Sequence, residues 1–436
     1  MAKPVLSWGR VSRDVHEVRH IDRLAGVNRD IFAAEGQTLF HGMGRSYGDV
    51  ALNPDATLYM TPAADRILQF DRTTGLIRAE AGTTLADLNT VTVPDGWITP
   101  VSPGTKFVTL GGAVANDVHG KNHHQVGSFG AHVQAFNLRR SDGEVLLCTR
   151  EQNSELFNAT ISGLGLTGYI EWVELQLKQI QSSNLYTENL PYDSLDAFFE
   201  LSEQSADWPY TAAWVDCFSP SHKIGAGIFT RARFSDDGEL NLSQSSASRP
   251  FPIELPSILL NKFTISTFNW MYKRRPGARF KGAQNYQNFF YPLDSIQGWN
   301  KLYGRNGFYQ HQSIIPMRES RAGITALLDT IRQRGQGSFL AVLKRHGAEQ
   351  SPGLNSFPLE GVSLALDFPN RGQKTIDFLR SLDAIVLQHG GRMYPAKDAL
   401  MTADTYQQTY PNWTQLEALR DPKITSSFWN RVTQKD

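Results

Sequence analysis

The pattern of apolar and polar positions along this 436-residue chain changes near residue 181. Before that point, apolar runs of strand length alternate with glycine-containing turns, as in "QTLFHGMGRS" (37–46), "ATLYMTP" (56–62) and "GYIEWVELQLKQI" (168–180). In "AFNLRRSDGEVLLC" (135–148), a Ser-Asp-Gly turn between two apolar runs predicts a β-hairpin. Helical windows are few here; we expect one at 84–90 and one at 153–159, the latter capped by Asn153 or Ser154.

Beyond residue 181 the predicted elements become longer. Apolar residues recur at helical spacing in 194–205, 321–336 and 375–391. Strand-like runs lie between them at 210–219, 307–316, 339–347 and 361–369. The pattern predicts an α+β protein whose second domain is rich in strands and backed by helices, and the length of the chain also favours two domains.

Composition narrows the classes of function. Lysine plus arginine equal aspartate plus glutamate at 43 each, so no net charge recruits nucleic acid. The sequence contains neither the apolar core of a secretory signal nor a run long enough to span a membrane, which predicts a cytoplasmic protein. Cys148 and Cys217 are the only cysteines, and we expect two buried thiols rather than a disulfide framework.

Residues 255–293 form a basic and aromatic segment. Between Glu254 and Asp294 there is no acidic residue, whereas six lysines and arginines alternate with eight phenylalanines, tyrosines and tryptophans between Lys262 and Phe290. One interpretation is a solvated loop. The other is a cationic, aromatic lid that meets an anionic or amphiphilic substrate, which leaves peripheral membrane contact open.

The stretch "HGMGRSYGDV" (41–50) is a candidate anion-binding turn. Its glycines do not have the G-x-G-x-x-G spacing of a Rossmann site, and the chain has no P-loop motif. "GLGLTG" (163–168) has that spacing but follows a helical window and leads into a strand, which is the wrong order. Backbone amides of a glycine-containing turn can still converge on an anion, although an ordinary β-turn explains the stretch equally well.

A second glycine-rich stretch, residues 100–130, contains His119, His123 and His124. Gly120 and Asn122 interrupt any helix that would align these histidines, and no carboxylate stands at ligand spacing, so we expect no metal site. A glycine-dense loop of this length is typical of backbone pressed against a large flat ligand.

The two stretches, in this order and followed by "ELFNATISGLGLTGYIEWVELQL" (155–177), resemble the vanillyl-alcohol oxidase type of FAD-binding flavoproteins. Within that family the sequence is similar to the oxidases of decaprenylphosphoryl-β-D-ribose. The motifs that carry this similarity are "GRSYGD", "PGT", "GGAVANDVHGKNHH", "GSFG", "SDGE", "ELF", "GLTG", "YPLD", "SFP", "DFP" and "AKD".

The resemblance implies a two-domain flavoprotein. Residues 1–181 and a returning segment, 392–436, would form the FAD-binding domain, and residues 182–391 an inserted substrate domain of β-sheet and helices. By the same resemblance, the residues expected to contact FAD are Gly42, Met43, Gly44, Arg45, Ser46, Tyr47, Gly104, Thr105, Thr109, Gly112, Asn116, Gly120, Gly168 and Ile170. Many relatives bind FAD covalently through a histidine in the first loop; Arg45 stands at that place here, so we expect FAD to be noncovalent.

The resemblance also implies a substrate pocket. By this resemblance the pocket would be lined by Trp214, Phe290, Gln310, Gln312, Lys344, Ser363 and Ala365, together with His119, Tyr394 and Lys397. This chain departs from the family at Ser363, where asparagine is usual, at Ala365, where cysteine is usual, and at Phe290, which lacks a tyrosine hydroxyl. These departures bear on which sugar and lipid are bound.

The chemistry of the candidate residues fits an alcohol oxidation. Lys397 is the first candidate for the base and Tyr394 the second, whereas His119 is expected to orient the flavin or a neighbour. Gln310 and Gln312 lie two apart in a predicted strand, so their side chains share a face. Lys344 stands in an apolar strand, where a substrate phosphate would pair its charge.

The function that follows is FAD-dependent oxidation of the ribose 2-hydroxyl of a polyprenyl-phosphoryl ribose to the 2-keto sugar. A separate reductase would complete the epimerisation to arabinose. Two alternatives remain: a flavin oxidase or dehydrogenase of free alditols or aldonolactones, and a catalytically silent flavin-binding module. The basic aromatic segment favours the first function.

Overall fold

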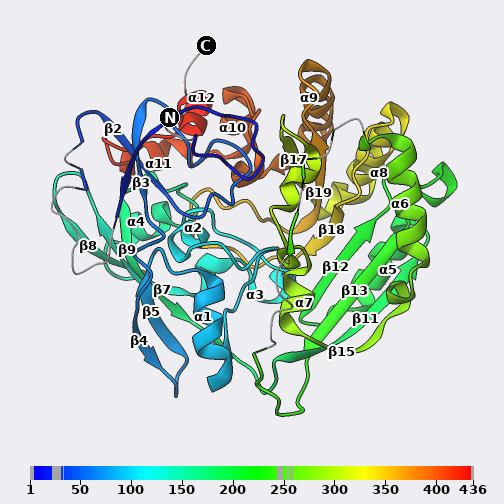
Figure 1. The fold of residues 1–436 in the computed structure, drawn as a ribbon, viewed down its shortest axis with the longest axis horizontal. Coiled ribbons are helices and arrows are strands. Elements are labelled where there is room, and N and C mark those ends of the chain that lie inside the picture. The colour runs from blue at the N-terminus through cyan, green and yellow to red at the C-terminus, as the bar shows by residue number, and fades with distance from the viewer. Residues whose placement is uncertain are drawn as a thin grey trace.

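A computed structural model describes residues 4–21, 31–32, 34–242, 249–251, 253–254, 256 and 259–433. The molecule has two lobes placed side by side (Figure 1). One lobe is built from the N-terminal strands and the C-terminal helices, and the other from a large sheet with its helices. The α+β class predicted from the sequence is confirmed, with helices and sheets in both lobes.

The first lobe contains two small sheets. A parallel sheet has the order β1 (Glu17–His20), β3 (Ala56–Met60), β2 (Gln37–His41), and an antiparallel sheet has the order β4 (Ile67–Asp71), β5 (Leu76–Glu80), β9 (Tyr169–Gln176), β7 (Val133–Arg139), β8 (Val145–Thr149). A short pair joins β6 (Trp97–Ile98) to β10 (Lys178–Gln179). The predicted hairpin is confirmed as β7 and β8, with Gly143 at φ 94° in the turn.

Along the chain, four α-helices are found between the strands of this lobe: α1 (Leu85–Thr92), α2 (Leu110–Ala115), α3 (His123–Val126) and α4 (Ser154–Thr160). The predicted helices at 84–90 and 153–159 are therefore confirmed as α1 and α4. Thr84 and Asp87 form a capping box at α1. Asn153 stands at the N-cap of α4 as expected, but with φ 51° and without a side-chain capping hydrogen bond; its amide instead donates to the carbonyl of Leu147 at 2.8 Å.

The second lobe is built on one eight-stranded antiparallel sheet. Its order is β15 (Lys281–Asn285), β11 (Asn184–Tyr192), β13 (Gly227–Phe234), β12 (Tyr210–Val215), β18 (Ala341–His346), β19 (Gly361–Pro369), β17 (Phe308–Pro316), β20 (Arg392–Met393). A further pair joins β14 (Arg249–Pro250) to β16 (Ile296–Gln297). The four strands predicted at 210–219, 307–316, 339–347 and 361–369 are confirmed as β12, β17, β18 and β19.

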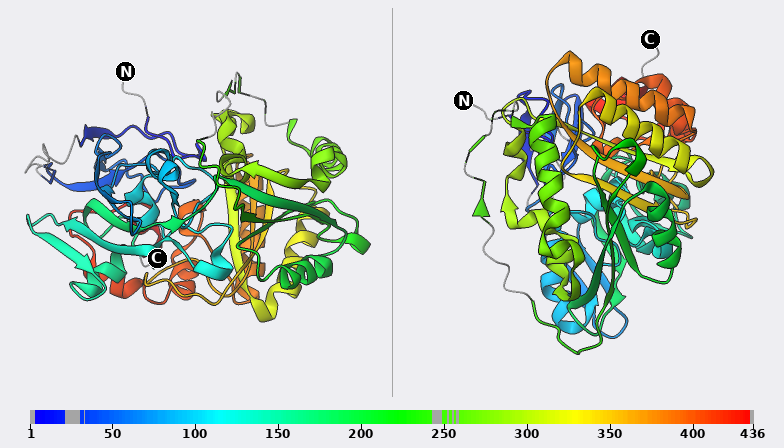
Figure 2. Two further views of the ribbon diagram at one scale, coloured as in Figure 1. Left: turned by 90° about the horizontal axis from the view of Figure 1, so that it is seen from below. Right: turned by 90° about the vertical axis from the view of Figure 1, so that its right-hand side faces the viewer.

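Helices cover this sheet on both faces. The helices α5 (Leu195–Gln204), α8 (Met317–Arg334) and α9 (Gln373–Gln388), which the periodicity predicted, pack on one face. The helix α6 (Lys262–Arg274) lies on the opposite face (Figure 2, left), and the short α7 (Tyr286–Phe290) follows β15 in the chain. The solvated-loop interpretation of residues 255–293 is thus wrong where the structure describes them; residues 255, 257 and 258 lie outside the described residues.

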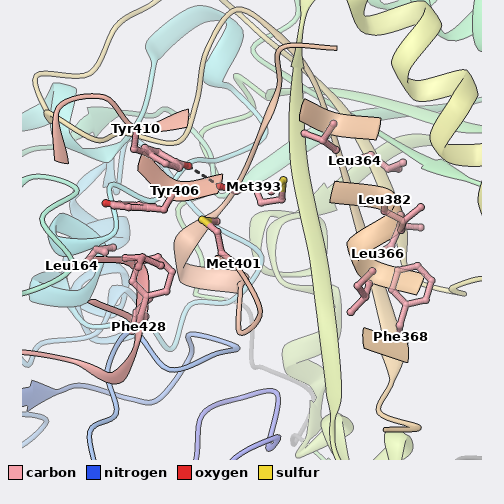
Figure 3. Packing of buried hydrophobic residues seen from close by; sticks show 14 of the residues in the cluster. Leu164, Leu364, Leu366, Phe368, Leu382, Met393, Met401, Tyr406, Tyr410 and Phe428 are labelled. Atoms are coloured by element: carbon pink, nitrogen blue, oxygen red, sulfur yellow. Dashed lines mark hydrogen bonds between the residues drawn. The ribbon is translucent and has the colours of Figure 1, made fainter. Parts of the chain in front are cut away.

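The C-terminal segment returns to the first lobe as α10 (Ala403–Thr409), α11 (Trp413–Leu419) and α12 (Ser427–Thr433). Tyr406, Tyr410 and Phe428 pack in the same buried cluster as Leu364 and Leu382 of the large sheet and its helix α9 (Figure 3). The main core therefore crosses from one lobe to the other, because the C-terminal helices contribute to both. The domain boundaries at 181 and 391 stay a prediction, and both expected thiols, Cys148 and Cys217, are free and buried.

Candidate active site

The glycine-rich stretch 41–50 forms a tight loop at the end of β2. Gly44 has φ 61°, a left-handed conformation that glycine adopts without strain. The loop is held from two sides: the amide of Trp8 donates to the carbonyl of Ser46 at 2.8 Å, and the amide of Tyr47 donates to the carbonyl of Ala396 at 2.9 Å. The loop is consequently fixed against the C-terminal turn that carries Lys397.

The second glycine-rich stretch meets this loop at Thr109. The Thr109 hydroxyl accepts from the amide of Gly112 at 3.2 Å, and a Cβ placed on Gly42 would lie 2.7 Å from the same hydroxyl. The two stretches approach so closely because Gly42 has no side chain that would collide with Thr109. Residues 100–130 are not loop throughout, as the glycine content suggested, since α2 and α3 lie within them.

Polar groups in these two stretches are placed to receive a bound group. The Arg45 guanidinium lies 4.4 Å from the ring of Trp8 and 5.4 Å from the ring of Phe107, and its Nε is buried without a hydrogen-bond partner among the described residues. The side-chain oxygen of Asn116 is buried and unpartnered in the same described part of the chain. A Cβ on Gly104 would meet no atom within 4 Å. Open space and unsatisfied polar atoms beside a glycine-rich backbone fit a nucleotide cofactor such as FAD.

Three other residues predicted to contact the cofactor differ in their exposure and in what they pack against. Met43 is 38% exposed at the tip of the first loop. Gly168 lies against β7, where a Cβ would come 2.7 Å from the carbonyl of Arg139. Ile170 is buried in the core of the first lobe, in the cluster that includes Leu138. Direct contact with the cofactor stays a prediction for these three residues, as it does for all the other residues predicted to bind FAD.

The register of the large sheet brings several predicted substrate residues into one row. Trp214 is opposite Val342, Val342 is opposite Ala365, and Ala365 is opposite Gln312. Directly opposed residues of antiparallel strands point to the same face. The row thus runs across β12, β18, β19 and β17, and Val342 at its centre is 42% exposed although it lies on an interior strand.

Neighbouring rows add Lys344, Ser363 and Gln310 to this face. Lys344 is opposite Ser363, and Gln310 is opposite Asp367, each two residues from the first row. The intervening residues, such as Leu343 and Leu364, point the other way into the core beneath α5, α8 and α9. We call the face that carries Trp214, Gln310, Gln312, Lys344, Ser363, Ala365 and Asp367 the site face.

His119 joins the second glycine-rich stretch to the site face. Its Nδ1 lies 2.6 Å from Lys344 Nζ and its Nε2 lies 2.9 Å from the side-chain amide of Gln312. Burial, followed by the charge of Lys344, lowers the pKa of His119 well below its usual value, so the imidazole is neutral. Lys344 also donates to the carbonyl of Gly120 at 2.7 Å, and burial together with nearby Lys121 lowers its pKa to about 7.

Lys397 lies where the first loop, the C-terminal turn and the site face meet. Its Nζ stands 4.0 Å above the ring of Tyr47, and no hydrogen-bond acceptor for it is found among the described residues. Burial lowers the pKa of Lys397 to about 8, although the charge of Asp367 acts in the opposite direction. A partly buried amine with a pKa near neutrality and no partner can accept or donate a proton.

Tyr394 is less suited to the role of base. Its hydroxyl donates to the carbonyl of Asn116 at 2.7 Å, and burial raises its pKa well above the usual value. Its ring stacks on Phe357 at 4.6 Å and lies 5.5 Å from the ring of His119. Tyr394 therefore braces the second glycine-rich stretch against the C-terminal turn.

Phe290 is placed differently from the other predicted substrate residues. It is 3% exposed and packs against Tyr210, Phe234 and Tyr291 in a separate buried aromatic cluster. Its backbone carbonyl lies 3.5 Å from Lys121 Nζ.

Sequence reasoning missed three titratable residues of the site. Asp367 accepts from Gln310 at 2.6 Å and Tyr303 at 3.3 Å, and burial raises its pKa to about 7. Burial lowers the pKa of Lys121 to about 7. His346 lies 2.8 Å from the hydroxyl of Ser363. An acid within the apolar run "SLALDFP" was a usable signal, by the same argument that identified Lys344.

Two observations on the described part of the chain concern metal binding and membrane-spanning helices. No group of three or more histidine, cysteine, aspartate or glutamate residues is arranged there to hold a metal ion. None of the helices found there has both the length and the apolar character required to span a bilayer.

Comparison with known proteins identifies the cofactor. Residues 15–149 match the model of an FAD binding domain family. The chain is 33% identical to a decaprenylphosphoryl-β-D-ribose oxidase of Mycolicibacterium smegmatis, over 96% of this chain and 95% of that protein. The chain belongs to the decaprenylphosphoryl-β-D-ribose oxidase family. It is an FAD-dependent oxidoreductase.

Two further relatives are similar to parts of this chain. An uncharacterized protein of Streptomyces coelicolor is 30% identical over 80% of this chain and 99% of its own length. An L-gulonolactone oxidase of Mus musculus is 30% identical over 37% of each chain. The glycine-rich loop at 41–50 and the stretch 100–130, including Gly104, lie within the residues that match the FAD binding domain.

Proposed function

We propose that this protein oxidises the 2-hydroxyl of a polyprenyl-phosphoryl-β-D-ribose to the 2-keto sugar, the first half of an epimerisation to the arabinose form. The proposal rests mainly on Lys397. Its partly buried amine has no partner among the described residues and lies at the junction of the two glycine-rich stretches and the site face. The name of the M. smegmatis relative supports the choice of substrate.

The reaction moves a hydride and a proton in different directions. FAD, when bound, supplies the acceptor for the hydride that leaves the alcohol carbon. Lys397 Nζ, as the neutral amine, takes the proton of the hydroxyl, so that the carbon–oxygen bond becomes a ketone. Gln310 and Gln312 hold the sugar from the site face, and Asp367 fixes the side chain of Gln310 through the 2.6 Å hydrogen bond.

Lys344 would bind the phosphate of this substrate. An ammonium has three hydrogens, and the chain engages two of them, at His119 and at the carbonyl of Gly120. One donor is left for an anionic oxygen. A phosphate would also raise the pKa of Lys344 from about 7 and hold its charge in a buried position.

Replacing Lys344 tests this role. We expect Lys344→Met to raise KM for the phosphoryl ribose by roughly ten- to a hundred-fold, because a charge-assisted hydrogen bond is lost. The limiting rate of flavin reduction should change far less. The control is Lys374→Met on the exposed surface of α9. An unchanged KM in Lys344→Met would show that Lys344 does not bind the phosphate.

The attachment of FAD gives another prediction. An arginine side chain does not form the histidyl–flavin bond, and Arg45 stands where many relatives place the histidine. We expect acid precipitation of the holoenzyme to release all of its flavin into the supernatant, as measured by absorbance. Flavin that stays with the precipitated polypeptide would contradict noncovalent binding.

The choice of substrate is tested with a panel of alcohols and an artificial electron acceptor. The proposal requires efficient turnover of phosphoryl ribose carrying a polyprenyl chain and poor turnover of free alditols and aldonolactones. The reverse order would favour an oxidase of soluble sugars, in line with the similarity to an L-gulonolactone oxidase. A keto-sugar product that accumulates without further conversion would support the need for a separate reductase.

A further inference from the structure

The helix α6 exposes an apolar face to solvent. Phe263, Thr267, Trp270 and Arg274 are spaced so that they fall on one side of the helix, with Met271 beside them. Phe263 is 78% exposed, the largest value for a large apolar side chain in the part of the chain that the structure describes; Trp270 is 57% and Met271 53% exposed. We call these five residues the outer α6 face. Exposed apolar side chains gathered in this way mark a binding surface.

The opposite side of α6 fixes the helix to the protein. Ile265 and Asn269 are buried, and the amide of Asn269 donates to Asp216 at 2.6 Å. Lys273 forms an ion pair with the same carboxylate at 2.6 Å. The outer face is therefore presented on an anchored helix with a defined orientation.

Four cations of α6 and the turn after it have no acidic partner among the described residues. Lys262, Arg274, Arg275 and Arg279 pair with no carboxylate among the described residues, and no acidic residue occurs in the sequence between Glu254 and Asp294. Arg274 instead stacks on Trp270 at 4.5 Å and Arg275 on Tyr272 at 3.7 Å. An amphipathic helix with aromatic and basic side chains of this kind is suited to an anionic lipid surface.

The position of α6 relates this surface to the site face. The ring of Tyr272, on the side of α6 that faces the protein, lies 4.8 Å from the ring of Trp214. Trp214 begins the row that ends at Gln312. In Figure 2 (left) α6 stands on the face of the large sheet opposite α5 and α8. A lipid chain that left the site face beside Trp214 would pass close to α6.

We propose that the outer α6 face docks the protein onto the surface of a bilayer that contains anionic lipid. The use of this contact to collect a lipid-linked sugar rests on the proposed function, but the docking itself does not. Association of two copies through this face is disfavoured, because it would bring the same cations together. Phe263, Trp270 and Met271 would enter the interface, and the cations would meet the head groups.

The test is cosedimentation of the FAD-loaded protein with vesicles of phosphatidylcholine, with and without phosphatidylglycerol. We expect binding to the anionic vesicles that weakens with salt. Phe263→Ser with Trp270→Ser should lower the partition at least about tenfold, and Arg274→Glu and Arg279→Glu about fivefold each or more. Val15→Ser, at an equally exposed apolar position (57%), and Lys374→Glu are the matched controls. Flavin absorbance and circular dichroism establish that each variant is folded.

Three results would overturn the proposal: wild-type protein that binds no anionic vesicle, a Phe263→Ser/Trp270→Ser protein that binds as tightly as wild type, or controls that lose as much binding as the α6 variants. Dimerisation lost in the α6 variants without vesicle binding would assign the face to a second copy instead. The vesicles contain no substrate, so these outcomes are independent of whether the proposed oxidation is correct.

Discussion

Lys397→Met should lower the rate of anaerobic flavin reduction by about a hundred- to ten-thousand-fold, the range expected for loss of a general base. Methionine keeps much of the length of the lysine side chain and removes only the amine. FAD should stay bound, because the groups that fit it, such as Arg45 and Asn116, lie in the two glycine-rich stretches. Stopped-flow absorbance gives the rate, and the flavin content of the purified variant gives the occupancy.

The pH profile separates a base from a fixed positive charge at this position. The pKa of Lys397 is lowered to about 8, so the neutral amine is the minor form below that pH and the major form above it. A base acts as the neutral amine; the wild-type rate should therefore rise with pH through about 8 and then level off. This rise should disappear in Lys397→Met and persist in Lys374→Met. A rate that falls as pH rises through 8 would show that the ammonium is the active form.

A substitution at Gly48, where the first loop touches the C-terminal turn, should have a large effect on the stability of the protein. A Cβ on Gly48 would lie 1.6 Å from the backbone carbonyl oxygen of Asp398, so one of the two segments must move. Arg431 adds to this junction, with one guanidinium nitrogen 2.7 Å from Asp49 and another 3.5 Å from Asp398. We expect Gly48→Ala to destabilise the protein by about 3 kcal/mol or more and to displace Lys397.

Thermal unfolding and flavin content measure this effect. Gly48→Ala should unfold at a lower temperature and retain less FAD. The matched control is Gly104→Ala, since a Cβ there meets no protein atom within 4 Å. This control should fold as stably as wild type without FAD, yet bind FAD more weakly if Gly104 faces the cofactor. Wild-type stability and flavin content in Gly48→Ala would mean that the two segments do not hold one another.

Much of the second lobe could be predicted from local pattern. The strands that became β12, β17, β18 and β19 are short apolar runs, and the helices α5, α8 and α9 carry an apolar stripe, so local sequence and tertiary packing agree. Gln310 and Gln312 share a face because strand side chains alternate. The order of the strands and their register do not follow from such patterns, since strands far apart in the sequence pair in the large sheet.

The site was harder to predict because its residues act through distant partners. Lys344 was expected to need a substrate anion, but His119 and Gly120, more than 200 residues earlier, already engage two of its hydrogens. The helix α6 was not predicted: a solvated loop and a cationic, aromatic lid were both left open there, because its apolar residues face solvent as well as the protein. Burial and the resulting pKa of Asp367 are likewise set by tertiary contacts that no local pattern contains.

The most direct measurement of the central proposal is a single anaerobic mixing experiment. The FAD-loaded protein is mixed with polyprenyl-phosphoryl ribose in the absence of oxygen, and the absorbance of oxidised flavin is followed. The proposed reaction transfers two electrons per sugar, so the flavin band should bleach and an equivalent amount of 2-keto sugar should form. A flavin that stays oxidised in the presence of this substrate, in a protein whose flavin can be reduced chemically, would contradict the proposed function.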